Sequence, residues 1–166
     1  MGSAGFGGFI LTSRKILIVE DCGDLLNLLG EALALLGWET IFAESGRETM
    51  NKLELERDLP SVVLLDMRTP VIGIKLAASL KAHPVYKYIP ILAVSGQSRG
   101  VTRERCLALG CDDFISKPFA LPELEMRLTN ILAVERRKAI MATDPMNLES
   151  NRQERRSRGA GRRRVA

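Results

Sequence analysis

A short apolar run that ends in one carboxylate constrains the fold of this chain more than any other feature. Residues 62–65 are Val, Val, Leu and Leu, Asp66 follows them, and Pro60 and Pro70 bound the stretch. An apolar run of this length, with β-branched residues and flanking prolines, is typical of a strand buried on both faces of a parallel sheet. Such a strand would carry Asp66 to its C-terminal end, the edge at which open α/β sheets bind their ligands.

Segments of the same kind recur along the chain and alternate with helical patterns. Leucines at helical spacing mark residues 25–36, where Asp24 is expected to cap the helix and Gly37 to end it. Strict alternation of strand and helix predicts an α/β fold, in which a parallel sheet has helices on both faces and right-handed crossovers. We expect strands at residues 15–19, 38–43, 61–66, 89–95 and 112–116, and helices at 25–36, 46–56, 73–82, 102–109 and from 123 to about 138.

Charge is unevenly distributed along the 166 residues. Residues 133–166 hold ten Lys and Arg against four Asp and Glu, whereas the rest of the chain holds 14 against 16. The chain is long enough for one domain with a core and a tail. We therefore expect a Gly-rich flexible leader at residues 1–13, a slightly acidic domain at 14–133, and a basic tail at 134–166 that extends the last helix and is then disordered.

The three cysteines, Cys22, Cys106 and Cys111, form no Cys-x-x-Cys pair and no Cys/His cluster in the sequence. Reduced thiols in the cytoplasm fit this pattern better than a disulfide framework or a metal-thiolate site. No apolar run approaches the ~18 residues of a membrane span. No basic residue precedes the short apolar stretch at residues 9–11, so a signal peptide is not expected. The sequence thus predicts a cytoplasmic protein without a membrane span.

Polar side chains follow the predicted strands at one edge of the sheet. Glu20 and Asp21 come directly after the first strand, Asp66 ends the third, Ser95 ends the fourth, and Lys117 follows the fifth. Carboxylates that gather at one edge repel one another and favour a divalent cation. Oxygen ligands with water in the remaining positions suit Mg²⁺, so the sequence predicts a magnesium site here.

Taken in order, these residues resemble the motifs of a known family. The acid pair, Asp66 with Thr69-Pro70 after it, Ser95-Gly96, and Lys117-Pro118-Phe119 resemble the receiver domain of bacterial two-component response regulators, over roughly residues 14–133. The resemblance implies a flavodoxin-like (βα)5 three-layer sandwich whose parallel strands are ordered 2-1-3-4-5. It also implies a cis peptide bond between Lys117 and Pro118.

The same resemblance implies roles for individual residues. Asp66 would be the phosphoacceptor, which attacks a phosphohistidine of a histidine kinase or phosphotransfer protein. Lys117 would pair with the phosphoryl oxygens, Ser95 would hydrogen-bond one of them, and Phe114 would move with Ser95 as the switch residue. The Mg²⁺ ligands would be Glu20, Asp21, Asp66 and the backbone carbonyl of Arg68.

The connection after Asp66 departs from the family pattern. Family members usually carry an Asp-Gly pair shortly after the Pro, whereas this chain reads Pro70-Val71-Ile72-Gly73, without the Asp and one residue shorter. The connection is therefore expected to be tighter and less polar. Arg68 also places a cation beside the acceptor, where it could pair with a carboxylate or reach the phosphate.

Three functional hypotheses follow. The first is a single-domain response regulator, a signalling phosphoacceptor rather than an enzyme, which switches the binding of a downstream protein or forms a dimer through its fourth helix, fifth strand and fifth helix. The second is an atypical receiver that docks a partner independently of phosphorylation, because its short connection has cost it phosphotransfer. The third is a nucleic-acid binder that acts through the basic tail.

Overall fold

The computed structural model describes residues 14–67, 70–96 and 101–143. The expectations for the leader at 1–13, for Arg68 and Thr69, and for residues 144–166 lie outside this part of the chain. The chain divides into two compact units, Leu11–Leu132 on the one hand and Met1–Ile10 with Ala133–Ala166 on the other. The first unit holds every element described below except the end of the last helix.

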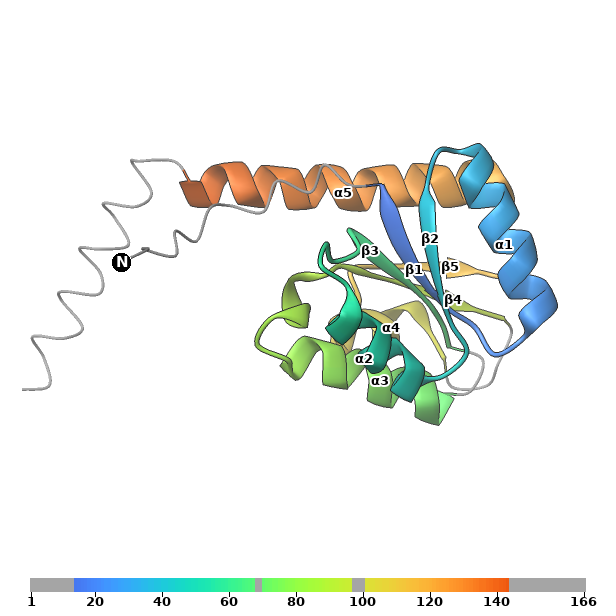
Figure 1. Ribbon diagram of the computed structural model, residues 1–166. Helices are drawn as coiled ribbons and strands as arrows, with labels where there is room; N and C mark the ends of the chain where they lie inside the picture. Colours follow the sequence, from blue (N-terminus) through green and yellow to red (C-terminus); the bar gives the residue numbers. More distant parts are fainter. Residues whose placement is uncertain (1–13, 68–69, 97–100, 144–166) are drawn as a thin grey trace, which may run out of the picture. The chain divides into compact units, whose positions relative to one another are not determined.

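One sheet of five parallel strands forms the centre of the first unit (Figure 1). The strands are β1 (Lys15–Val19), β2 (Glu39–Ala43), β3 (Val62–Asp66), β4 (Ile91–Ser95) and β5 (Asp113–Ser116). Their order is β2-β1-β3-β4-β5, which confirms the predicted topology. Val19 pairs with Leu65, and Ser95 pairs with Ser116. This register brings the residues at the C-terminal ends of β1, β3, β4 and β5 to the same edge of the sheet.

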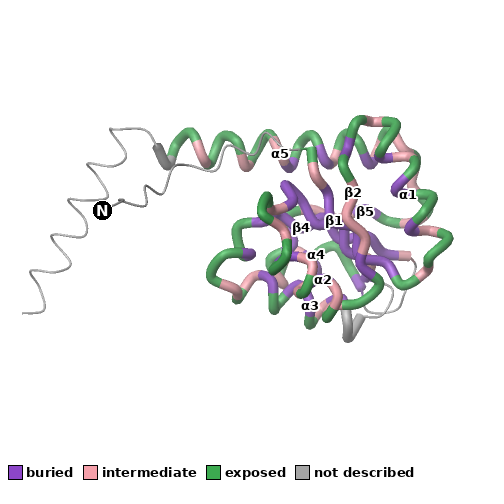
Figure 2. Tube along the Cα trace, in the orientation of Figure 1, coloured by how far each residue is buried: buried purple, intermediate pink, exposed green. Residues whose placement is uncertain are grey.

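Helices cover both faces of the sheet (Figure 1). They are α1 (Gly23–Leu35), α2 (Gly46–Leu55), α3 (Pro70–Ala82), α4 (Arg103–Ala108) and α5 (Leu121–Thr143). Alternate strand residues point to opposite faces. On one face Ile16 and Leu64 pack with buried leucines of α1 and α5, and on the other Leu17 and Leu65 pack with side chains of α2, α3 and α4. The central strands β1, β3 and β4 are therefore buried along most of their length, whereas the edge strands β2 and β5 are largely half-buried and the outer sides of the helices are exposed (Figure 2).

The boundaries of three helices differ from the sequence prediction by more than one residue. The N-cap of α1 is Cys22, whose side chain makes no capping hydrogen bond, and Asp24 lies in the first turn instead of capping it. The prediction for Asp24 was therefore wrong, since α1 already begins at Gly23, one residue after the acid pair. Helix α3 begins at Pro70 and not at Gly73, and α5 extends to Thr143. Gly37 follows α1 with φ 79°, as expected for the residue that ends a helix in the left-handed region.

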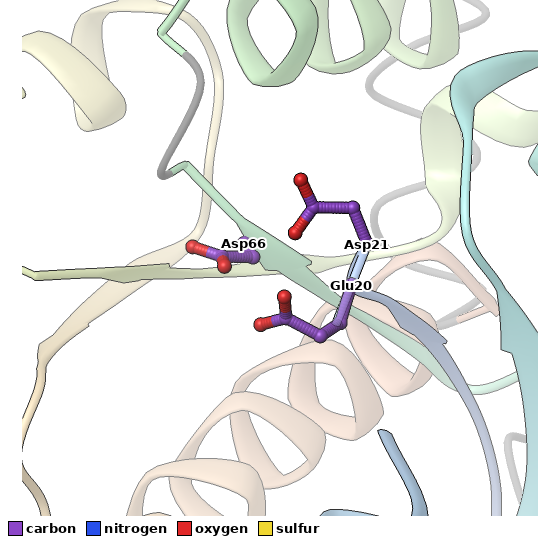
Figure 3. A group of neighbouring side chains, drawn as sticks. All are labelled: Glu20, Asp21 and Asp66. Atoms are coloured by element: carbon purple, nitrogen blue, oxygen red, sulfur yellow. The ribbon is translucent and has the colours of Figure 1, made fainter. Parts of the chain in front are cut away.

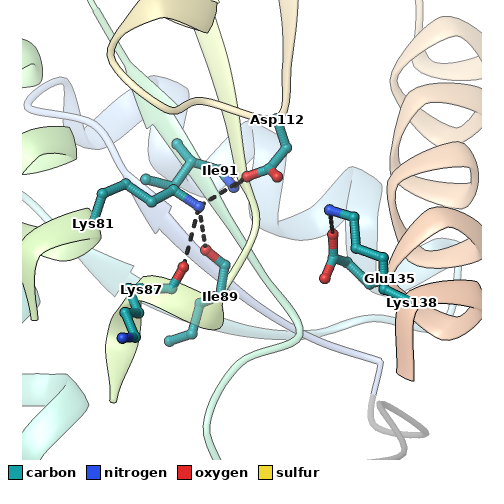
Figure 4. Close-up of polar contacts among 7 residues, drawn as sticks. All are labelled: Lys81, Lys87, Ile89, Ile91, Asp112, Glu135 and Lys138. Atoms are coloured by element: carbon teal, nitrogen blue, oxygen red, sulfur yellow. Dashed lines mark hydrogen bonds and ion pairs between the residues drawn. The ribbon is translucent and has the colours of Figure 1, made fainter. Parts of the chain in front are cut away.

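A cluster of polar contacts ties α3 to the N-terminal end of β4 (Figure 4). Asp112 accepts a hydrogen bond from the Ile91 backbone N–H at 2.8 Å and pairs with the Lys81 ammonium at 3.0 Å. Lys81 also donates to the carbonyl oxygen of Ile89 at 3.1 Å, beyond the short 3₁₀ helix η1 (Tyr86–Tyr88). These contacts fasten the end of the sheet opposite to the one that carries Asp66. The same figure shows the Glu135–Lys138 pair within α5, at 2.6 Å.

None of the helices among the described residues is both long enough and apolar enough to cross a membrane.

Candidate functional site

The acid pair after β1 and the aspartate that ends β3 form the centre of the candidate site (Figure 3). One carboxylate oxygen from each of Glu20, Asp21 and Asp66 lies within 4.8 Å of the others. The cluster forms because Val19 and Leu65 are paired in neighbouring parallel strands, so both strands deliver their next residue to the same place. Glu20 is buried, Asp66 is half-buried and Asp21 is exposed, which leaves the cluster open to solvent on the Asp21 side. The sequence prediction that these three residues meet is confirmed.

Lys117 reaches this cluster from the end of β5. Its ammonium nitrogen lies 2.9 Å from Oε2 of Glu20 and 3.1 Å from Oδ2 of Asp66. The peptide bond between Lys117 and Pro118 is cis, as the resemblance implied. The Lys117 backbone N–H donates to the carbonyl oxygen of Ser95 at 2.6 Å, so β4 fixes the residue from which the side chain extends. The ammonium group of Lys117 thus bridges two carboxylates, one that follows β1 and one that ends β3.

The Glu20 carboxylate is the most constrained group of the site. Its side chain is 2% exposed, and Oε1 accepts a hydrogen bond from the Cys22 backbone N–H at 3.0 Å. Burial raises the pKa of Glu20, and the neighbouring Asp66 raises it further, while the bonds from Lys117 and Cys22 act in the opposite direction. The contribution of the Cys22 N–H was not predicted from the sequence. It arises because Cys22, the one residue between the acid pair and Gly23, is the N-cap of α1.

The three carboxylates fit a magnesium ion by their chemistry and spacing. Mg²⁺ binds oxygen at about 2.0–2.1 Å in an octahedron, which sets neighbouring and opposite ligand oxygens roughly 3–4 Å apart. Oxygens of Glu20, Asp21 and Asp66 that already lie within 4.8 Å of one another need only small side-chain rotations to meet this requirement. The fourth predicted ligand, the carbonyl of Arg68, lies outside the described residues.

Ser95 lies on β4, the strand next to β3, and Phe114 lies on β5, which pairs with β4. Ser95 is fully buried, and its hydroxyl donates to the carbonyl oxygen of Gly96 at 2.9 Å. Phe114 lies on β5 opposite Ala93, is half-buried, and packs against the core beneath α2, α3 and α4. The structure therefore places both residues on the strands that the sequence predicted. Their roles in a switch stay predictions.

The connection from β3 to α3 is as short as the sequence indicated. Only Met67, Arg68 and Thr69 separate Asp66 from the first residue of α3, Pro70. Met67 is fully buried, and its backbone N–H donates to the carbonyl oxygen of Val94 at 2.7 Å. Gly73 of α3 packs against the peptide bond between Asp66 and Met67, which was not predicted from the sequence. The one sequence feature that pointed to this close packing was the missing residue before Gly73.

Comparison with known proteins identifies the family. The family model described as "Response regulator receiver domain" matches residues 16–129. The transcriptional regulatory protein PrrA of Mycobacterium tuberculosis is 33% identical over 80% of this chain and 54% of its own length. The chain thus spans about half the length of the curated relatives it matches.

Two solved structures have the same fold. The signal receiver domain of a signal transduction histidine kinase from Syntrophus aciditrophicus is 32% identical, with a TM-score of 0.64 over 72% of this chain and 89% of that one. The receiver domain of the sensor histidine kinase PA1611 from Pseudomonas aeruginosa, determined with a magnesium ion in its active site cleft, is 27% identical, with a TM-score of 0.64 over 73% of this chain and 98% of that one. The fold, the edge cluster and the family model agree, and the chain belongs to the response regulator receiver domain family.

Proposed function

We propose that this chain works as a phosphorylation-controlled switch, which accepts a phosphoryl group on Asp66 from a histidine kinase or phosphotransfer protein. The observation that carries the proposal is the position of the Asp66 carboxylate. It ends a buried strand, lies among two further carboxylates, and is held at 3.1 Å by the ammonium group of Lys117. A carboxylate fixed in this way is a nucleophile with a defined orientation, which is the requirement for covalent phosphoryl transfer.

The reaction transfers one phosphoryl group from nitrogen to oxygen. A carboxylate oxygen of Asp66 attacks the phosphorus of a phosphohistidine and forms an O–P bond, while the N–P bond breaks and its electron pair stays on the imidazole nitrogen. Lys117 is near enough to follow the charge that develops on the phosphoryl oxygens, because its ammonium already contacts Asp66. Glu20 keeps Lys117 at the site, since it accepts a second hydrogen bond from the same ammonium.

Magnesium is part of the proposal, with Glu20, Asp21 and Asp66 as the side-chain ligands. When bound, Mg²⁺ supplies positive charge between the attacking carboxylate and the phosphoryl oxygens. The exposed carboxylate of Asp21 offers the ion a route from solvent. The free cysteines of the chain fit a reducing compartment, and we place the reaction in the cytoplasm.

The signal would leave the domain through α4, β5 and α5. Ser95 lies at the end of β4 beside the site, and Phe114 lies on the adjacent β5. If the Ser95 hydroxyl exchanges its bond to Gly96 for one to a phosphoryl oxygen, the packing next to Phe114 changes with it. The surface formed by these elements would then bind a downstream protein or a second copy of the chain.

Incubation with acetyl phosphate and Mg²⁺, followed by intact-mass measurement, tests the proposal. We expect the mass of one phosphoryl group to be added to the wild-type chain, and neither Asp66→Asn nor wild type in EDTA to gain it. Absence of the adduct from the wild type, or its persistence in Asp66→Asn, contradicts the proposal. Partner binding that Asp66→Asn leaves unchanged would instead favour a docking module that works without phosphorylation.

A further inference from the structure

Gly73 lies against the peptide bond that carries Asp66. It is buried in the first turns of α3. A Cβ atom at this position would lie 2.8 Å from Sδ of Met67 and 3.3 Å from both the carbonyl oxygen of Asp66 and Cα of Met67. Two of these three neighbours are backbone atoms, so a side chain at position 73 would require the backbone to move by a few tenths of an ångström.

The contacted backbone has little freedom to move. The carbonyl oxygen of Asp66 and the N–H of Met67 belong to one peptide group, whose N–H is bonded to the carbonyl oxygen of Val94 at 2.7 Å. Met67 is also fully buried in the core. The peptide group is thus held by β4 on one side and limited by Gly73 on the other. A methyl group at 73 would require this peptide or α3 to shift by a few tenths of an ångström, and a rotation of the peptide would turn the adjoining Asp66 Cα and its carboxylate.

Glycine inside a helix normally costs about 0.5–1 kcal/mol relative to alanine. Helix α3 has this cost at Gly73, and the close approach to Asp66 and Met67 gives a physical reason for it. The short connection after Asp66 brings α3 onto the strand end, where a residue without a side chain fits and displaces no neighbouring atom. The alternative is that the Met67 thioether simply turns aside, in which case position 73 affects packing alone.

We propose that Gly73 is a positioning residue for the phosphotransfer step, which sets the orientation of the Asp66 carboxylate relative to Lys117 and the other two acids. The inference rests on the proposed function of Asp66 as phosphoacceptor. Reacting groups tolerate little displacement, and a misplacement of about 1 Å can cost roughly 100-fold in rate. A shift of a few tenths of an ångström should then reduce the rate by about tenfold.

The test is Gly73→Ala, with the rate of phosphorylation by acetyl phosphate measured at saturating donor and Mg²⁺. We expect the maximal rate to fall by about tenfold or more. The Mg²⁺ dissociation constant should change less than the rate, because two of the three side-chain ligands, Glu20 and Asp21, follow β1 and do not contact position 73. The matched control is Gly46→Ala on α2. A Cβ there would meet only side-chain carbons of Leu76, at 3.7 Å or more, so its rate should stay within about twofold.

A second measurement separates this inference from the proposed function. In ¹H–¹⁵N spectra, Gly73→Ala should shift the amide signal of Met67, and Gly46→Ala should not. If the wild type is not phosphorylated, the proposed function fails, while the Met67 signal still shows whether position 73 sets this peptide. A Gly73→Ala protein with wild-type rate or with an unmoved Met67 signal overturns the inference.

If Gly73→Ala does not fold, the comparison is made between Met67→Ala and Met67→Ala/Gly73→Ala. The thioether overlap is then absent, and only the 3.3 Å approach to the Asp66–Met67 backbone remains. A rate that falls again by about tenfold in the double variant supports a positioning role. Equal rates in the two proteins overturn it.

Discussion

The ammonium nitrogen of Lys117 lies 2.9 Å from Oε2 of Glu20, although β3 and β4 separate the strands from which the two residues emerge. The lysine therefore spans the site from β5 to β1 and passes Asp66, which it contacts at 3.1 Å. The Glu20 side chain is 2% exposed, so the Lys117 ammonium offsets the charge of a buried carboxylate as well as that of the proposed phosphoacceptor Asp66. Lys117 and a bound cation would consequently compete for the same two acids.

This competition gives the first prediction, for Lys117→Met. Removal of one positive charge should tighten Mg²⁺ binding by about tenfold, because the ion no longer meets a like charge within a few ångströms. The phosphorylation rate should fall by about 100-fold, because the phosphoryl oxygens lose their cation. Isothermal titration calorimetry and intact-mass kinetics measure the two effects. Their opposite directions distinguish this result from general damage to the site.

Lys15→Met is the matched control for that substitution. Lys15 also makes two ion pairs, with Glu39 at 3.2 Å and Glu56 at 2.9 Å, but it begins β1 at the other edge of the sheet. We expect it to leave both Mg²⁺ affinity and phosphorylation unchanged. An equal effect of the two lysine variants on Mg²⁺ affinity would contradict the competition between Lys117 and the ion.

The second prediction concerns the start of α2 and its dependence on pH. Glu48 pairs with Lys52 at 2.7 Å and accepts the backbone N–H of Glu44 at 2.9 Å, and these contacts lower the pKa of Glu48. A lowered carboxyl pKa contributes stability above the unfolded-state value, and this stability is lost as pH falls through the folded-state value. Glu48→Gln should therefore be less stable than wild type at pH 7, and the difference should decline as pH falls through the unfolded-state value of about 4.3 and further below it.

Urea denaturation of both proteins at several pH values measures this difference. The control is Glu54→Gln on the same helix, because the Glu54 side chain makes no ion pair or hydrogen bond within the described part of the chain. The Glu48 side chain is 38% exposed, so its effect should be small and should weaken in high salt. A stability difference that stays constant from pH 7 down to about pH 2 would refute the electrostatic cause, because only the ionised carboxylate makes these contacts.

The third prediction is that the three thiols differ in reactivity. Cys106 and Cys111 are buried, and burial raises the pKa of both, to about 12 for Cys111. Thiolate is the reactive form, so neither should react at pH 8 in the native protein. Cys22 is half-buried at the start of α1 and should react first. A thiol-exchange assay should count one fast thiol in the native state and three in guanidinium, and Cys22→Ser should remove the fast one.

The fourth prediction concerns Asp112, which holds the end of the sheet opposite to Asp66. Asp112→Ala removes the acceptor of the Ile91 N–H and the partner of Lys81 together, and should destabilise the domain by about 1–3 kcal/mol. Asp112→Asn retains an oxygen for the Ile91 N–H and should cost less. Thermal and urea unfolding measure both values. Equal costs for the two variants would show that the charge pair, and not the bond to Ile91, stabilises this end.

Much of the site followed from local sequence patterns. The apolar run before Asp66 and the similar run before Glu20 each specify a buried strand, and strict alternation with helices requires these strands to be parallel. Parallel strands present their C-terminal ends at one edge, so Glu20, Asp21, Asp66, Ser95 and Lys117 had to gather there. Asp24 shows the limit of such patterns, because the end of β1, and not a capping side chain, decides where α1 begins.

Two relationships were decided by the tertiary structure alone. Lys117 contacts Glu20 as well as Asp66 because the register of four strands and the course of one long side chain bring them within 2.9 Å. Gly73 lies against the Asp66–Met67 peptide because α3 packs directly onto the end of β3. The sequence by itself determined the fold, the edge and the residues of the site, since periodicity reports which face each residue occupies. Contacts between elements far apart in the chain depend on differences of a few tenths of an ångström in how closely those elements pack, and no local pattern encodes such differences.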